Sequence, residues 1–186
     1  MSLIPDANSS EDNPEGSKGF TWGVFKNKAT GKKLYAYSTH FWWQTGKTEA
    51  ERAKNETMRI HNVRELLAKA DEVSRRHGRL AIVGGGDLNS SLVARKASLG
   101  EFERFGLVDA QYAVDGASPW SSWHGDPKRD ALGNLRGFFR AGGDNPSNSL
   151  DHVHYRMVKP LSLKVDRSER AMECSDHSPV VFEFVH

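Results

Sequence analysis

Strand-like and helix-like segments alternate through the first half of the chain, and this alternation limits the choice of fold more than any other feature. Residues 19–28 place Phe20, Trp22 and Val24 at alternate positions, which is the spacing of a strand with one buried face. The next four residues, Ala-Thr-Gly-Lys, are typical of a turn, and residues 33–40 are typical of a returning strand. The pattern therefore predicts a β-hairpin.

A long amphipathic helix is predicted after this hairpin. Thr48 and Glu51, three residues apart, form the capping box with which many helices begin. Apolar residues then recur every three or four positions and mark one buried face: Ile60, Val63, Leu67 and Ala70. Gly78 follows and is expected to end the helix.

The sequence after this helix continues the alternation. An apolar strand is predicted at residues 79–83, and it leads into the sequence GGGDLN at residues 84–89. A shorter helix is predicted over about residues 98–105, closed by Gly106, and residues 107–110 return to extended structure. Strands that alternate with helices favour an α/β fold.

The last third of the chain has a different character. Residues 115–149 are irregular and rich in Gly, Asn, Ser and Pro, and a loop of this length inside a compact domain usually has a function. Two further strands, at residues 150–158 and 178–185, are predicted to close the chain.

The composition fits one folded domain behind a short polar segment. A chain of 186 residues has the usual length of one domain, which we expect at residues 19–186, after a mobile lead-in at residues 1–18. The net charge of +2 is too small to indicate nucleic-acid binding by itself. The single cysteine, Cys174, excludes an intrachain disulfide, and no apolar run is long enough for a transmembrane segment.

Four polar clusters lie at the ends of predicted strands. They are Thr39-His40, Asp87 with Asn89, Asp151, and Asp176-His177. Catalytic groups of α/β proteins gather where strand ends meet loops. A single histidine at a strand end is more often a surface residue, and an aspartate after glycines is more often a turn former. Four such clusters in this order are hard to explain by turn chemistry alone.

The segments around these clusters resemble the motifs of one superfamily. They are STHF at residues 38–41, GGGDLNSS at 84–91, SLDHVHY at 149–155 and CSDHSPV at 174–180. In this order they are similar to the signatures of the endonuclease/exonuclease/phosphatase superfamily, which includes deoxyribonucleases, apurinic endonucleases, neutral sphingomyelinases and inositol polyphosphate 5-phosphatases. Further support comes from Arg59, from GLVDA at residues 106–110 and from SSWHG at residues 121–125.

The resemblance implies an α/β fold in which a β-sandwich is flanked by helices in four layers. It covers about residues 19–186 and matches the C-terminal portion of a family domain. The asparagine and the metal-binding glutamate of the family's N-terminal half have no counterpart before His40. Three explanations remain open: a shortened chain, a chain completed by a complementing N-terminal segment from another polypeptide, or a natural short form.

The resemblance also implies a catalytic set, which consists of His40, Asp87, Asn89, Asp151 and His177. His177 would be the active-site histidine, and Asp151 would be the carboxylate that fixes its tautomer. Asp87 would orient or deprotonate the attacking water, and Asn89 would donate to a phosphoryl oxygen. His40 would make a second contact to the phosphate and stabilise its developing charge.

Asp176 is the expected metal ligand, with Mg²⁺ or Mn²⁺ as the cofactor, because hard cations prefer carboxylate oxygens. Metal binding by this chain alone is expected to be weak, because the family's main carboxylate has no counterpart here. His152 and His154 are a second candidate pair of ligands. Since the family pattern turns Asp151 into the site, we expect these two histidines to face the other way.

The function that the resemblance implies is hydrolysis of a phosphoester, with a nucleic acid, a phospholipid head group or an inositol phosphate as the substrate. Basic residues of the long loop are suited to a polyanion: Lys128, Arg129, Arg136 and Arg140. Its aromatic residues are suited to a lipid or to stacking on bases: Trp120, Trp123, Phe138 and Phe139. The alternative is a non-catalytic remnant of the same fold that acts as a binding or scaffold module.

Overall fold

The computed structural model describes residues 19–42, 46–91, 97–114, 122–125, 127–132, 135–138 and 149–186. The expected lead-in at residues 1–18 lies outside these ranges, so the predicted domain boundary stays a prediction. Within the described ranges, no helix combines the length and the apolar character that crossing a membrane requires.

A mixed five-stranded sheet forms the centre of the described structure. Its first two strands, β1 (Gly19–Lys26) and β2 (Lys33–His40), are antiparallel, which confirms the predicted hairpin. Strand β2 then pairs in parallel with β3 (Ala81–Asp87), and β3 pairs antiparallel with β7 (Asp151–Arg156). The short strand β4 (Val108–Asp109) completes the order β1-β2-β3-β7-β4.

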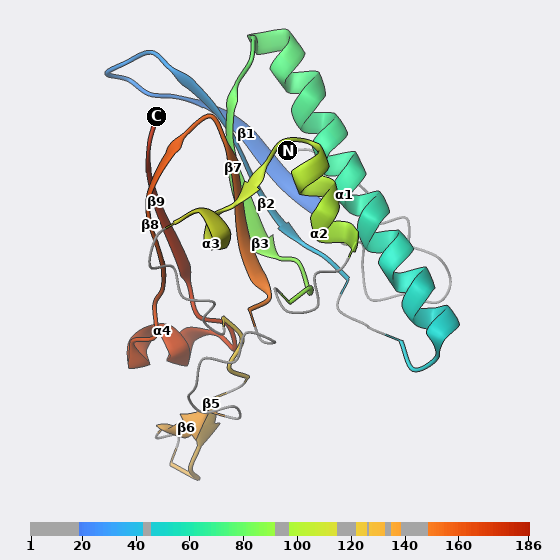
Figure 1. The fold of residues 1–186 in the computed structure, drawn as a ribbon. Helices are drawn as coiled ribbons and strands as arrows, with labels where there is room; N and C mark the ends of the chain where they lie inside the picture. Colours follow the sequence, from blue (N-terminus) through green and yellow to red (C-terminus); the bar gives the residue numbers. More distant parts are fainter. Residues whose placement is uncertain are drawn as a thin grey trace.

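Two helices cover one face of this sheet (Figure 1). The long helix α1 (Glu49–His77) begins at the predicted Thr48 capping box and ends before Gly78, whose φ is +81°. The shorter helix α2 (Ala97–Arg104) packs beside α1 and lies within one residue of its predicted bounds. Both helix predictions are confirmed.

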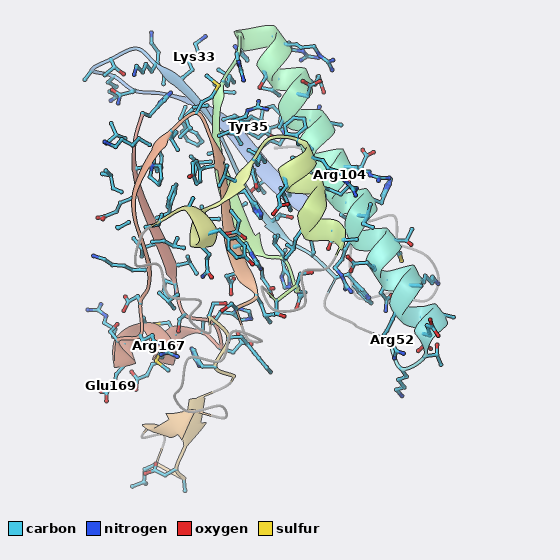
Figure 2. All side chains as sticks on the ribbon, viewed as in Figure 1. Lys33, Tyr35, Arg52, Arg104, Arg167 and Glu169 are labelled. Atoms are coloured by element: carbon cyan, nitrogen blue, oxygen red, sulfur yellow. The ribbon has the colours of Figure 1, made fainter. Side chains whose placement is uncertain are left out.

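The main core fills the space between the helices and the sheet. Tyr35 lies there, between the sheet and α1 (Figure 2). The buried side chains that it joins come from both layers and include Phe20, Tyr37 and Ile82 from the strands and Val63, Leu66, Leu67 and Phe102 from the helices. Burial of this apolar area is the dominant stabilising contribution to such a core.

A second, smaller sheet packs near the opposite face. Strands β8 (Lys159–Val165) and β9 (Val180–Val185) form an antiparallel hairpin. Buried Leu163 joins Tyr155 of β7 and the partly buried Phe182 in a second apolar cluster. Helices, central sheet and second sheet are three of the four expected layers, and they confirm the α/β class with two facing sheets.

The end of the chain contains more elements than the sequence predicted. Two closing strands were expected, but β8 and helix α4 (Glu169–Cys174) lie between β7 and β9. The signal for β8 is present, because Leu161, Leu163 and Val165 alternate with polar residues. Pro160 weakens this signal, since proline in a strand removes a backbone hydrogen-bond donor.

Two other predictions are wrong in part. The irregular segment at 115–149 includes a small hairpin of β5 (Pro127–Arg129) and β6 (Leu135–Phe138). The extended segment at 107–110 is shorter than predicted, because Asp109 caps a one-turn helix, α3 (Ala110–Ala113), with its carboxylate. Aspartate is a preferred residue at such a cap.

Strand β3 continues through its glycines to Asp87, four residues beyond the predicted end. Glycines are depleted in strands, but here all three of them meet close contacts that any side chain would block. A Cβ on Gly84 would lie 2.3 Å from the ring of Tyr37. Gly86 has φ +143°, and a Cβ there would lie 1.9 Å from the backbone oxygen of Thr39. The glycines therefore allow β2 and β3 to pair closely next to Asp87.

We expect Gly86→Ala to lower the free energy of unfolding by at least about 1–3 kcal/mol, the usual cost of a strained backbone conformation. The matched control is Gly100→Ala in α2, where nothing lies within 4 Å of the new methyl group. That change should raise the free energy of unfolding by about 0.4–1 kcal/mol, because alanine loses less chain entropy on folding. Urea unfolding of both variants tests this, and equal effects would contradict the steric explanation.

Candidate active site

Three site residues lie in one row across the central sheet. His40 is paired with Asp87 in the β2–β3 ladder, and Asp87 is paired with Asp151 in the β3–β7 ladder. Residues paired across neighbouring strands project to the same face of a sheet. In β2 the adjacent residue, Thr39, is buried and lies on the opposite face, so the row faces away from α1. The register thus brings together three residues that are far apart in the sequence.

His177 reaches this row from the segment between α4 and β9. Its Nδ1 lies 2.7 Å from Oδ2 of Asp151, and its Nε2 lies 3.7 Å from Oδ2 of Asp87. The Nε2 atom of His40 lies 3.4 Å from the same Asp87 oxygen. The structure therefore joins Asp151 and His177 in the expected hydrogen bond, and it places the Asp87 carboxylate between two imidazoles.

The hydrogen bond to Asp151 determines which nitrogen of His177 faces the site. An ionised carboxylate can only accept, so Nδ1 must carry the proton that it shares with Asp151. In the neutral ring, Nε2 then holds the lone pair that points toward Asp87. This is the arrangement of a histidine that can take up and release a proton at Nε2.

The electrostatic surroundings of His177 favour its protonated form. Partial burial opposes the charge, but the hydrogen bond to Asp151 and the charges of Asp151, Asp87 and Asp176 outweigh burial, so the pKa of His177 is raised. Burial is also the main reason why the pKa of Asp87 is raised, and the charge of Asp151 adds to this effect. Asp87 is thus a stronger base than an ordinary surface carboxylate.

Asn89 lies in a tight turn directly after β3. Its φ is +48°, a left-handed conformation that asparagine tolerates better than most residues. Its backbone N–H donates to Oδ1 of Asp87 at 2.8 Å, and its side-chain amide donates to the carbonyl of Phe41 at 2.9 Å and more weakly to Asp87 at 3.3 Å. The turn therefore fixes Asp87 and Asn89 relative to the end of β2.

The segment SSWHG, noted in the sequence only as supporting the resemblance, contributes directly to the geometry. The Ser122 hydroxyl accepts from the backbone N–H groups of Leu150 and Asp151, both at 3.1 Å. The carbonyl of Ser122 accepts from the N–H of Ser178 at 2.7 Å, next to His177. Ser122 therefore holds the two partners of the Asp151–His177 pair from one position, a role that no spacing rule in the sequence could have indicated.

Asp176 lies at the rim of the site with its side chain 46% exposed. The indole N–H of Trp123 donates to its Oδ2 at 3.3 Å, and Nε2 of His177 lies 4.0 Å from the same oxygen. Trp123, expected to meet a lipid or a base, thus contacts a carboxylate. Trp120, Phe139 and Arg140, also singled out in the long loop, lie outside the described residues. Of Lys128, Arg129, Arg136 and Phe138 the structure describes the backbone and not the side chains.

The carboxylates and imidazoles of the site are the side chains that could bind a metal ion. In the part of the chain that the structure describes, no group of three or more His, Cys, Asp and Glu side chains has an arrangement that could hold a metal ion. Asp176 alone supplies one exposed carboxylate with an oxygen that already accepts from Trp123. The described residues therefore do not form a complete metal centre.

Arg59 supports the site from the helix layer. Its side chain is 2% exposed, and its guanidinium donates to Glu56 at 3.1 Å and to the carbonyl of Trp42 at 2.9 Å. Glu56 in turn accepts from the N–H of Ser98 at the start of α2. Arg59 thus fixes the chain just after His40 to both helices.

His152 and His154 face away from the site, as expected. Both are buried on the side of β7 that faces the helices, and His154 stacks on Phe102 of α2 with ring centroids 3.9 Å apart. Asp151 projects to the opposite face, toward a cleft of about 520 Å³. Asp151, His177, Gly85, Val153, Val180 and Phe182 are among the residues that line this cleft. The α4 helix and the β5–β6 hairpin both lie at the lower end of the molecule in Figure 1.

Comparison with known proteins finds similarity in structure and not in sequence. The sequence matches no family model and no curated protein. A mannosyl-6-phosphatase of Bacteroides thetaiotaomicron is similar with a TM-score of 0.57 and 21% identity, over 91% of this chain and 57% of that one.

Two further structures show the same similarity. An endonuclease/exonuclease/phosphatase protein of Beutenbergia cavernae has a TM-score of 0.64 and 17% identity, over 99% of this chain and 44% of that one. The human Nocturnin catalytic domain with a bound sulfate anion has a TM-score of 0.56 and 17% identity, over 90% and 54%. This chain spans about half the length of these structures, which fits the expected correspondence to the C-terminal portion of the domain. The chain therefore has the endonuclease/exonuclease/phosphatase fold.

Proposed function

We propose that this chain carries the proton-transfer part of a metal-dependent phosphoester hydrolase. The observation that carries the proposal is the geometry around His177. The Asp151 carboxylate accepts from Nδ1 and orients the imidazole, and the Asp87 carboxylate lies 3.7 Å from Nε2. This arrangement suits general acid–base chemistry, in which a positioned histidine holds or moves a proton. The similar fold of a mannosyl-6-phosphatase and of a Nocturnin domain with bound sulfate supports a phosphoester as the class of substrate.

Each group has a proposed part in the reaction. Asp87 orients the attacking water and accepts its proton, for which its raised pKa is suited. As the water oxygen bonds to phosphorus, the ester P–O bond breaks, and the leaving oxygen takes the proton that His177 holds at Nε2. Asp87, which lies 3.7 Å from this nitrogen, then passes the proton that it took from the water to His177. Asn89 and His40 contact the remaining phosphoryl oxygens, where fixed donors stabilise the charge that develops in the transition state.

The proposed cation is Mg²⁺ or Mn²⁺ beside Asp176, where it would neutralise charge on the phosphoester. Since the described residues do not form a complete metal centre, no step of the mechanism is assigned to it. The identity of the substrate is part of the proposal only as a class: nucleic acid, phospholipid head group or inositol phosphate. A complementing N-terminal segment remains an expectation.

His177→Ala should reduce turnover by roughly 10²–10⁴, the usual contribution of a positioned acid–base group. Hydrolysis of bis(4-nitrophenyl) phosphate at high Mg²⁺ or Mn²⁺ concentration measures this. The matched control is His61→Ala on the exposed side of α1, which should keep the wild-type rate. A His177→Ala rate above about a tenth of wild type would remove His177 from the mechanism. The wild-type rate itself is expected to be low or absent in this chain alone, because the family's main metal-binding carboxylate has no counterpart in it.

Asp151→Asn should lower the pKa of His177, because the amide removes the negative charge that favours the imidazolium form. NMR titration of the ring protons measures this shift, with His61 as the internal reference. The raised pKa of His177 also affects stability. The ion pair between protonated His177 and Asp151 stabilises the fold fully at pH values below the unfolded-state pKa of histidine, about 6.5. This contribution is lost as the pH rises through the folded-state pKa of His177. An unchanged His177 pKa in Asp151→Asn would contradict the assigned partnership.

Calorimetry should show weak binding of Mg²⁺ and Mn²⁺ to this chain, because Mg²⁺ usually needs one or two well-placed carboxylates in addition to water and substrate oxygens. Binding of inorganic phosphate should persist without metal and should weaken in the double variant His40→Ala/His177→Ala. A tight, stoichiometric metal site would mean that an unrecognised ligand substitutes for the missing glutamate.

A further inference from the structure

Asp151 and His152 are consecutive residues of β7, so their side chains project to opposite faces of the sheet. Asp151 faces the cleft, whereas His152 faces the helices and is 1% exposed. The ring of His152 has a partner at each nitrogen. Its Nδ1 lies 2.9 Å from Oδ2 of Asp109, and its Nε2 lies 2.6 Å from the backbone oxygen of Ser90. His152 therefore links the N-terminal cap of α3 to the turn that follows β3.

Both partners of the ring are hydrogen-bond acceptors. A carbonyl oxygen can only accept, and an ionised carboxylate can only accept. The ring must carry a proton on each nitrogen to make both bonds, so the geometry requires an imidazolium ion paired with the Asp109 carboxylate. A buried charge of this kind is tolerated when it is paired and fully hydrogen-bonded.

The other groups around His152 are compatible with this charge. Burial opposes the charge of His152, but the hydrogen bond and charge of Asp109, the Ser90 carbonyl and the charge of Asp151 outweigh burial and raise the pKa of His152.

The titratable neighbours of His152 add no further positive charge. Burial lowers the pKa of His154 to about 4, so that ring is neutral near pH 7. The phenol of Tyr37 is also uncharged, since burial and nearby Tyr35 and Asp109 raise its pKa. Burial raises the pKa of Asp109, but the hydrogen bond from His152 and the positive charge of that ring outweigh burial, so the pKa of Asp109 is lowered.

The turn that His152 contacts is the one that carries Asn89. Ser90 is 0% exposed and directly follows Asn89, whose own side chain is bound to Phe41 and Asp87 on the site side. The turn is therefore held from two directions, by the Asn89 amide at the site and by His152 within the core. If the ring were removed, the Ser90 carbonyl and the Asp109 carboxylate would both lose a buried partner.

We propose that His152 is a positioning residue: as a buried imidazolium held by Asp109, it fixes the Ser90 carbonyl and thereby the placement of Asn89 and Asp87 in the site. The importance of that placement for hydrolysis rests on the proposed function. The positioning itself does not, and it can be measured without substrate.

The first measurement is the protonation state of the ring. Long-range ¹H–¹⁵N correlation spectra of the wild-type chain at pH 7 should show both nitrogens of His152 protonated and His154 neutral. In Asp109→Asn, His152 should become singly protonated. A wild-type His152 with one protonated nitrogen would overturn the proposal.

The second measurement is hydrogen exchange of the backbone amides at residues 88–91 in His152→Gln. Gln cannot donate to Asp109 and Ser90 as a rigid ring does, and loss of a buried hydrogen bond should speed exchange tenfold or more. The Asn89 side-chain amide signals should shift as well. The matched control is His154→Phe, because His154 lies on the same strand and face, is equally buried and stacks on Phe102. That variant should leave exchange in the turn unchanged.

Asp109→Asn serves as the second variant if His152→Gln does not fold, and it should loosen the same turn. Unchanged exchange at residues 88–91 in the variants that fold would overturn the proposal, as would an equal effect of His154→Phe. These readouts separate the two proposals. If His152→Gln loosens the turn but His177→Ala hydrolyses the substrate at the wild-type rate, the positioning role of His152 is retained and the proposed function is refuted.

Discussion

The close pairing of β3 with both of its neighbours is the constraint on which the rest of the structure depends. Strand β3 is parallel to β2 and antiparallel to β7, so the end of β2, the end of β3 and the start of β7 meet at one edge of the sheet. His40, Asp87 and Asp151 stand at these three positions. A slip of one residue in either ladder would send one of these side chains into the helix-facing core. The glycines of β3 keep the register because they allow contacts with Tyr37 and Thr39 that no side chain would permit.

The two faces of this sheet are coupled through adjacent residues. On one face Asp151 orients His177, and on the other His152 binds Asp109 and the Ser90 carbonyl. Because a strand alternates its side chains, any displacement of β7 moves both sets of contacts together. Arg59 adds a similar link from α1 to the chain after His40. The site is thus supported by polar groups in the core and not by packing alone.

Local sequence signals were sufficient for the elements that carry their own periodicity or caps. The Thr48 capping box, the Gly78 stop and the β1–β2 hairpin were all predictable, because each depends on residues close together in the chain. The strand predicted at residues 79–83 is too short, because glycine has a low strand propensity. Pairing with β2 on one side and β7 on the other keeps the glycines at 84–86 extended.

The same distinction applies to the site. The resemblance identified the residues that meet there, and the structure brings His40, Asp87, Asn89, Asp151 and His177 together. The supports, Ser122 and His152, could not be predicted. Ser122 binds backbone groups nearly thirty residues away, and His152 bonds to Ser90 across 62 positions of sequence. Such contacts are fixed by tertiary structure and leave no local pattern.

The carboxylates around His177 favour its protonated form but oppose the binding of an anion. Its imidazole lies 2.7, 3.7 and 4.0 Å from oxygens of Asp151, Asp87 and Asp176, and these carboxylates favour the protonated ring. The same carboxylates would repel the negative charge of a phosphoester, the proposed class of substrate, in a partly buried site where screening by water is weak. A proton on His177 offsets one of these charges but not all of them. Asp176 is the most exposed of the three, with 46% of its side chain accessible against 19% for Asp151 and 14% for Asp87. Of these three carboxylates, Asp176 is therefore the one that the proposed hydrated cation would meet first, and contact there would leave the Asp151–His177 hydrogen bond in place.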